Sequence, residues 1–216
     1  MLSVIPLSCE CGAVTGRITA ADHIHRNICH CKGCQAYSRW LRRPELLDDA
    51  GGTDLLQITP SQLQIDQGED QLRAVRQTPK GAVRWYTDCC RTPVANSLDA
   101  AWVPWLALSH GFVDSVQVGD TRAPELAPTR WIIHTRAALR PVEGGHPTGP
   151  ASLVFSTLAS TLVDTIKGRA TPHPFFDGKQ LRREPQLLGP GEREAIGLGD
   201  APAPPVVRRK PAFGCG

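Results

Sequence analysis

The sequence predicts a mainly β protein that is held together by clustered cysteines and carries one helix near its C-terminus. Three observations favour this class. Short runs that alternate apolar with polar residues, broken by turns, occupy the first 140 residues. Seven of the eight cysteines fall into three small clusters, and one four-residue apolar repeat follows later. With 216 residues, 41% of them hydrophobic, the chain is long enough for one domain with a full core.

The strands are expected where alternation is clearest and turn residues bound the run. They are predicted over residues 13–18, 55–58, 63–65, 72–76, 82–87, 102–108 and 131–139. The fourth and fifth of these should pair as a hairpin around Pro79-Lys80-Gly81. Within 82–87, Val83 and Trp85 should face one side of the sheet, and Arg84 and Tyr86 the other.

The helix is predicted from Val154, Leu158, Leu162 and Ile166, which repeat every four residues. Pro150 suits the start of such a helix, and Gly168 suits its C-terminal cap. We expect the apolar stripe to pack on the domain. Binding of a partner by this stripe is the alternative.

Three regions follow from these patterns. We expect residues 1–140 to form a β domain that contains the three cysteine clusters, residues 141–184 to form a helical extension packed on it, and residues 185–216 to form a tail rich in proline and glycine. We expect the tail to be poorly packed, because such a composition offers few apolar side chains to a core.

Composition excludes several classes of function. There are 24 basic and 21 acidic residues, a formal charge of +3, and no long basic stripe, so nucleic acid is not an expected partner. No apolar run approaches the roughly 20 residues of a membrane span, and the first residues do not resemble a secretory signal. We therefore expect a cytoplasmic, reducing location, where clustered cysteines are more often metal ligands than disulfides.

The central cluster, Cys29-x-Cys31-x-x-Cys34, can direct three thiolates at one ion, most often zinc. It supplies no fourth ligand. An open position is typical of catalytic zinc, where water or a substrate thiolate would bind. A distant side chain such as His110 or His134 could instead complete a structural site, and the spacing leaves both possibilities open.

A second zinc site is predicted from residues far apart in the sequence. Cys9 and Cys11 give two ligands, and the Cys89-Cys90 pair gives the rest. Such a site would tie the N-terminus to the end of the predicted hairpin, so we interpret it as structural. The chain is thus expected to bind one or two zinc ions.

These motifs resemble those of the glutathione-dependent formaldehyde-activating enzyme (Gfa-like) family, which includes the centromere protein V group. The resemblance rests on Cys9-Glu10-Cys11-Gly12, Cys29-His30-Cys31-Lys32-Gly33-Cys34 and Cys89-Cys90-Arg91-Thr92-Pro93, in this order. It implies a β-tent fold of small antiparallel sheets clasped by zinc. It also implies a structural zinc on Cys9, Cys11 and Cys90, and a catalytic zinc on Cys29, Cys31 and Cys34.

The third motif departs from the family pattern at two positions. Thr87 stands where the family has its other cysteine, so Cys89, Asp88 or water must supply the fourth structural ligand. Since neighbouring residues of an extended chain point opposite ways, Cys89 and Cys90 can share an ion only on a bent backbone. Arg91 also replaces a glycine that permits a tight turn.

The resemblance implies a carbon–sulfur lyase that acts on thiol–aldehyde adducts such as S-hydroxymethylglutathione. Arg39, Arg42 and Arg43 follow the central cluster and are candidates to bind an anionic thiol such as glutathione. The alternative for these arginines, and the commoner outcome for such residues, is a solvated basic segment. No catalytic residue is assigned beyond the metal ligands. A noncatalytic, zinc-stabilised module that binds another protein is the alternative function.

Overall fold

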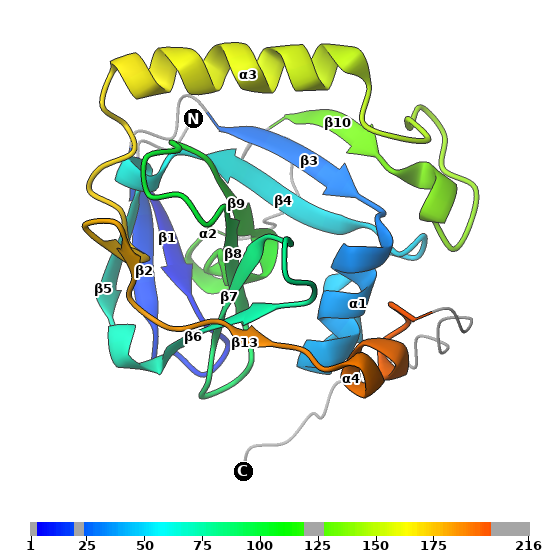
Figure 1. The fold of residues 1–216 in the computed structure, drawn as a ribbon, viewed down its shortest axis with the longest axis horizontal. Helices are drawn as coiled ribbons and strands as arrows, with labels where there is room; N and C mark the ends of the chain where they lie inside the picture. The colour runs from blue at the N-terminus through cyan, green and yellow to red at the C-terminus, as the bar shows by residue number, and fades with distance from the viewer. Residues whose placement is uncertain (1–3, 20–23, 119–127, 200–216) are drawn as a thin grey trace.

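The computed structural model describes residues 4–19, 24–118 and 128–199, and these residues form a mainly β protein, as predicted (Figure 1). Thirteen strands lie within the described ranges. They are β1 (Val4–Ser8), β2 (Thr15–Thr19), β3 (His25–Cys29), β4 (Thr53–Ile58), β5 (Leu63–Gln67), β6 (Leu72–Arg76), β7 (Val83–Thr87), β8 (Pro93–Ser97), β9 (Leu106–Ser109), β10 (Thr129–Ile133), β11 (Phe176–Asp177), β12 (Gln180–Leu181) and β13 (Gln186–Leu187).

Four α-helices and five short 3-10 helices connect or cover these strands in the described residues. The α-helices are α1 (Lys32–Leu41), α2 (Ser115–Val118), α3 (Ala151–Ile166) and α4 (Pro190–Ala195). The 3-10 helices are η2 (Pro44–Leu46), η3 (Pro60–Gln62), η4 (Glu69–Gln71), η5 (His110–Phe112) and η6 (Thr135–Ala137). None of the described helices combines the length and the apolar character needed to cross a membrane.

The strands form two main sheets. Strands β1, β2 and β5 make a three-stranded antiparallel sheet. The larger sheet has eight strands in the order β10-β3-β4-β9-β8-β7-β6-β13. Its inner pairs are antiparallel, whereas β10 on β3 and β13 on β6, at the two edges, are parallel. The predicted hairpin is confirmed, because β6 and β7 pair antiparallel.

The main core lies between these two sheets. Ile5 and Ile18 of the small sheet and Leu56, Trp85 and Leu108 of the large one are all at most 1% exposed. Both sheets thus bury one face, which is the arrangement that strand alternation predicts.

The other face of the large sheet is covered by helix α1, which the sequence analysis did not predict. Tyr37 and Leu41 of α1 pack with Val75 of β6 and Tyr86 of β7 in a second buried cluster. The predicted alternation of β7 is confirmed, since Val83 and Trp85 belong to the first cluster and Tyr86 to the second. The helix is hard to recognise because polar Gln35 and Ser38 share its buried face.

Residues 186–199 differ from the expected poorly packed tail. Strand β13 extends the large sheet beside β6, and the chain then turns into α4 beside α1 (Figure 1). Leu188 is 2% exposed and Ile196 is 7% exposed, both within the second cluster. A few well-placed apolar residues therefore anchor this segment in spite of its proline and glycine content. The rest of the predicted tail, 200–216, lies outside the described residues.

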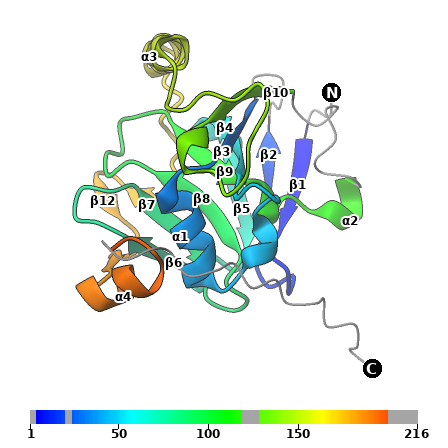
Figure 2. The ribbon, with the colours of Figure 1, turned by 90° about the vertical axis from the view of Figure 1, so that its right-hand side faces the viewer.

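Helix α3 forms where it was predicted but does not pack as expected. Pro150 precedes its first turn, and Gly168, just beyond its C-terminal cap Lys167, has a φ of +68°. None of its residues is buried, and the repeat from Val154 to Ile166 faces away from the sheets. Figure 2 shows the helix end on, standing off from β3, β4 and β10.

An aromatic anchor fastens the chain after α3. Phe175 is fully buried, and its ring stacks on Trp85 with centroids 4.3 Å apart. The ring of His173 lies edge-on to Phe176, and its Nδ1 accepts a hydrogen bond from the backbone N–H of Phe175. Burial, with a further contribution from the charge of Arg182, lowers the pKa of His173 to about 4.

Protonation of His173 should destabilise the fold in mild acid. Its pKa is about 4 in the fold against 6.5 for an ordinary histidine, so the unfolded chain binds more protons between these values. Above pH 6.5 the imidazole of His173 is neutral in both the folded and the unfolded chain, so it should not change the free energy of unfolding there. As the pH falls through this window, its protonation should lower that free energy, by up to roughly 3 kcal/mol below the folded pKa.

Denaturant titrations of the wild type and of His173→Gln across this window measure the effect. The variant should show the shallower pH dependence, and the acid sensitivity of the thiols, which both proteins share, cancels in the comparison. Equal dependences in the two proteins would contradict the assignment.

Candidate metal centre

The outer cysteine cluster joins two turns that are far apart in the sequence. Cys9 and Cys11 lie in the turn between β1 and β2, and Cys89 and Cys90 lie in the turn between β7 and β8. Their four sulfur atoms all lie within 4.8 Å of one another. The Sγ–Sγ distances are 3.6 Å for Cys9–Cys11, 3.9 Å for Cys9–Cys89 and 3.8 Å for Cys89–Cys90.

These distances fit a tetrahedral metal ion. A tetrahedron with metal–sulfur bonds of about 2.3 Å has edges of about 3.8 Å. The four cysteines that the sequence assigned to this site are thus brought together with the spacing that a bound ion requires. Asp88 is not part of the group and pairs instead with Arg73, at 3.2 Å.

A tight turn allows the adjacent Cys89 and Cys90 to face the same point. The Arg91 N–H donates to the Thr87 carbonyl at 2.8 Å, and the Thr87 N–H donates to the Thr92 carbonyl at 2.9 Å. The two cysteines therefore lie in a turn rather than on an extended strand. This is the bent backbone that sharing one ion demands.

Arg91 takes the left-handed backbone conformation that a glycine would adopt more easily, with a φ of +57°. That conformation costs a non-glycine residue roughly 1–2 kcal/mol. Its guanidinium lies over the ring of Trp40 at 4.4 Å and near that of Tyr86 at 5.5 Å, and it donates to the Trp40 carbonyl at 3.1 Å. These contacts with α1 and β7 offset the strain.

The thiols of the outer cluster differ in pKa, because burial raises the pKa of Cys9 and raises that of Cys89 to about 12, whereas hydrogen bonds lower that of Cys90. The Val14 N–H donates to Cys9 Sγ at 3.2 Å. The hydroxyls of Thr87 and Thr92 lie 3.3 and 3.2 Å from Cys90 Sγ. Burial by itself raises the pKa of Cys90, but these hydroxyls and hydrogen bonds with Cys11 outweigh it and lower the pKa to about 6. Thr87 thus serves as a hydrogen-bond partner of a candidate ligand.

The central cluster lies where β3 meets α1. Cys29 ends β3, Cys31 is the N-cap of α1, and Cys34 lies in the first turn of the helix. The three sulfurs lie within 4.8 Å of one another, and the Cys34 N–H donates to Cys31 Sγ at 3.3 Å. The positive end of the helix dipole favours negative charge at this position.

Unlike the outer cluster, this group contains three ligand atoms rather than four. Neither His110 nor His134 belongs to it, nor does His30, which lies between two of the cysteines. The His30 ring is 1% exposed, with its Nε2 3.6 Å from an Asp48 carboxylate oxygen. Among the described residues, the protein thus offers one closed four-sulfur site and one three-sulfur site.

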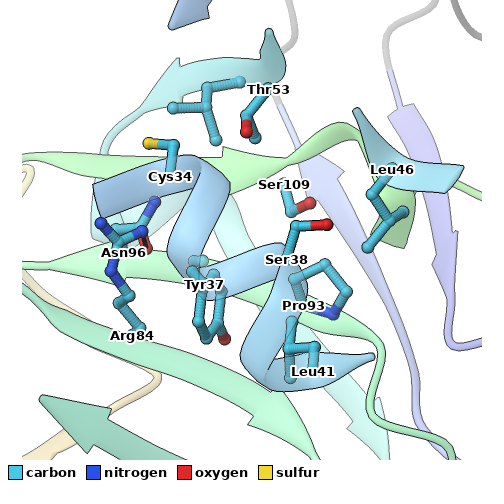
Figure 3. Close-up of a pocket in the computed structure, with 12 residues that line it drawn as sticks. Cys34, Tyr37, Ser38, Leu41, Leu46, Thr53, Arg84, Pro93, Asn96 and Ser109 are labelled. Carbon is cyan, nitrogen blue, oxygen red and sulfur yellow. Dashed lines mark hydrogen bonds between the residues drawn. The ribbon is translucent and has the colours of Figure 1, made fainter. Parts of the chain in front are cut away.

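A small cavity of about 20 Å³ adjoins the central cluster on the side of Cys34 (Figure 3). Its walls are formed by Cys34, Tyr37, Ser38, Leu41, Leu46, Thr53, Leu55, Arg84, Pro93, Ala95, Asn96 and Ser109. This volume accommodates about one water-sized molecule. The Thr53 hydroxyl oxygen is buried and has no hydrogen-bond partner among the described residues. Because Thr53 pairs with Cys29 across β3 and β4, this hydroxyl lies next to the cluster.

Arg84 contributes a positive charge beside Cys34, and the sequence analysis did not assign it a role. It hydrogen-bonds to the Cys34 side chain, and it donates to Asn96 Oδ1 at 3.2 Å. Hydrogen bonds with Cys29 and Cys31, and then the charge of Arg84, hold the pKa of Cys34 well below its usual value. The strand alternation placed Arg84 on the face opposite Val83 and Trp85, but no local pattern indicated that Cys34 would lie against that face.

The arginines chosen from the sequence lie elsewhere. Arg39 donates to the Ile196 carbonyl at 3.2 Å and to Gln35 at 3.3 Å, so it holds the C-terminal segment against α1. Arg42 is exposed where α1 ends. Arg43 lies near the outer cluster, where it donates to the Cys90 carbonyl at 3.2 Å and pairs with Glu10 at 2.8 Å. None of the three lines the cavity.

Replacing Arg91 separates its backbone strain from its side-chain contacts. Arg91→Ala keeps the strain and loses the contacts, so we expect it to unfold about 1–2 kcal/mol more easily than wild type. Arg91→Gly removes both and should be more stable than the alanine variant by about 1 kcal/mol. Denaturant unfolding at matched metal content gives both differences. Equal stability of the Arg91→Ala and Arg91→Gly proteins would contradict the proposal that the backbone is strained at this turn.

The amino-acid sequence matches one family model over most of its length. No curated protein matches the chain. Residues 1–184 match a family model, and this range includes both cysteine clusters, the cavity and α3. The chain therefore belongs to the Family of unknown function (DUF6151).

Proposed function

We propose that both cysteine clusters bind zinc, and that the central one is a catalytic site of Gfa-like type with carbon–sulfur lyase activity. Zinc is the metal that tetrahedral thiolate sites most often hold in a reducing compartment, and we place the protein in the cytoplasm. The four-sulfur outer cluster suits a structural ion, since it ties the β1–β2 turn to the β7–β8 turn.

The observation that carries the catalytic proposal is the three-sulfur geometry of the central cluster beside a cavity. Three protein ligands with an open position are typical of catalytic zinc. When bound there, zinc would act as a Lewis acid and favour the thiolate form of a small thiol. The proposed substrate class is a thiol–aldehyde adduct such as S-hydroxymethylglutathione.

The protein residues around the cavity have complementary roles in this proposal. Three thiolates place a net negative charge around a divalent ion, and the guanidinium of Arg84 offsets it. The Thr53 hydroxyl, which lacks a partner among the described residues, can donate a hydrogen bond to an aldehyde or hydroxymethyl oxygen in the cavity. The apolar walls around Leu41 and Leu55 exclude bulk water, which strengthens both interactions.

Zinc content tests the metal assignment. We expect two zinc ions per chain, and one after Cys31→Ser, because that change removes a third of the central ligands. Cys89→Ser should also lose one ion and should lower thermal stability more, since the outer ion ties distant segments together. Cys215→Ser removes a cysteine that belongs to neither motif and is the matched control. Unchanged zinc content in both cluster variants would contradict two separate sites.

Thiol binding to the cobalt-substituted protein tests the catalytic assignment. Thiols should change the visible spectrum of the wild-type protein. Arg84→Gln should weaken their binding about tenfold to a hundredfold, since a hydrogen bond with a charged partner is lost. Arg39→Gln removes an equal charge from a side chain that does not line the cavity, and should bind as wild type does. A spectrum that no thiol alters would remove the basis for the lyase proposal.

The size of the cavity favours a second candidate, a noncatalytic zinc-stabilised module that binds another protein. A volume of about 20 Å³ holds a water-sized molecule, whereas glutathione is far larger. Titration with 2-mercaptoethanol and with glutathione distinguishes the candidates. Binding of both supports the lyase, binding of the small thiol alone excludes glutathione as the substrate thiol, and binding of neither favours the noncatalytic module.

A further inference from the structure

Helix α3 presents its apolar side to solvent and its polar side to the rest of the protein. The exposed fractions are 53% for Val154, 78% for Phe155, 64% for Leu158, 63% for Leu162 and 79% for Ile166. A surface helix normally has the opposite orientation, with its apolar stripe against the core. An unsatisfied apolar face of this kind indicates a binding surface.

The side of α3 that faces the sheet carries mostly polar residues. Ser156 accepts a hydrogen bond from Arg130 at 2.9 Å, and Asp164 pairs with Arg169 at 2.9 Å. A cleft of about 350 Å³, lined by Gln57, Thr59 and other mostly polar groups, separates the helix from β4. The bond from Arg130 of β10 to Ser156, and the one from the Ser61 N–H to the Arg169 carbonyl at 3.2 Å, tie this face to the domain. The apolar stripe therefore does not result from a helix that is free to rotate.

We propose that this stripe is a homodimer interface, in which α3 of one copy packs antiparallel on α3 of a second copy. The stripe is symmetric about the level of Ser160, because positions 154 and 166 lie six residues to either side and positions 158 and 162 lie two. A two-fold axis at that level brings Leu158 opposite Leu162 of the other copy, and Val154 opposite Ile166. A self-complementary patch of this kind is what a two-fold interface requires.

Charge and area both favour a second copy. The one charged residue of the helix, Asp164, is turned inward and neutralised by Arg169, so two stripes meet without repulsion. The five exposed apolar side chains of the stripe offer on the order of 500 Å² per copy. Two copies together would bury roughly 1,000 Å², the lower bound of a specific interface.

A lipid surface fits the same helix less well. Helices that lie on membranes carry lysine and arginine on their polar face, which remains in contact with headgroups and water. Helix α3 contains neither residue, and its polar face is directed at its own domain. The homodimer does not depend on the chemistry of the metal centres.

The mass of the zinc-loaded full-length chain in solution, measured by sedimentation velocity over a range of micromolar concentrations, tests the proposal. We expect twice the mass of one chain at high concentration, and loss of the dimer in Leu158→Glu and in Leu162→Lys. Val116→Glu introduces the same charge at a side chain that is 94% exposed on α2, and should dimerise as wild type does. A wild type that stays monomeric, or that remains dimeric after Leu158→Glu, would overturn the proposal.

Mixing the two variants tests the antiparallel register. In the proposed dimer, the glutamate at 158 of one copy faces the lysine at 162 of the other, and the remaining two leucines face each other. An equimolar mixture should therefore form the heterodimer that neither variant forms alone. A parallel pair of helices brings 158 opposite 158, so a mixture that stays monomeric would overturn this arrangement.

Vesicle binding by a monomeric wild type would identify a lipid surface as the occupant instead.

Discussion

The alternation of side chains along strand β7 connects the core, the helix and both metal centres. One face of the strand carries Trp85 into the space between the sheets, where it stacks on Phe175. The other face carries Arg84 and Tyr86 to helix α1, so that Arg84 reaches Cys34. The end of the same strand leads into the turn that holds Cys89 and Cys90 of the outer cluster. A shift of one residue in this strand would exchange the two faces and disrupt all of these contacts at once.

The two cysteine clusters reduce the cost of negative charge by different means. The outer cluster uses backbone N–H groups and the hydroxyls of Thr87 and Thr92, which are neutral donors fixed in tight turns. The central cluster uses the N-terminus of α1 and the guanidinium of Arg84. Neutral donors suit a closed site, whereas a charged side chain at the edge of a cavity can also contact a bound molecule. This difference parallels the structural and catalytic roles that we propose for the two sites.

The apolar repeat of helix α3 is compatible with two arrangements, one with the apolar face packed on the domain and one with that face exposed to a partner. Its four-residue apolar repeat specifies a helix and an apolar face, but carries no information on what covers that face. The inward orientation is determined by polar contacts, in which Arg130 and Arg169 hold Ser156 and Asp164. The apolar face is left for a partner, which is why packing on the domain, the commoner outcome for such a repeat, does not occur here.

The sequence by itself determined the mainly β class, the β6–β7 hairpin, the helix over α3 and the cysteines of both clusters other than Cys89, because these depend on local periodicity and on the spacing of like residues. It did not identify α1, since the polar Gln35 and Ser38 interrupt the apolar face of that helix, nor the anchoring of residues 186–199 by Leu188 and Ile196. Tertiary structure alone decided that Cys89 joins Cys90 in one cluster, because that requires a left-handed Arg91 held by an aromatic ring from α1. It also decided that Arg84, rather than Arg39 or Arg42, lies at the central sulfurs. These outcomes depend on contacts between residues distant in the sequence, and local patterns cannot specify which distant surfaces will meet.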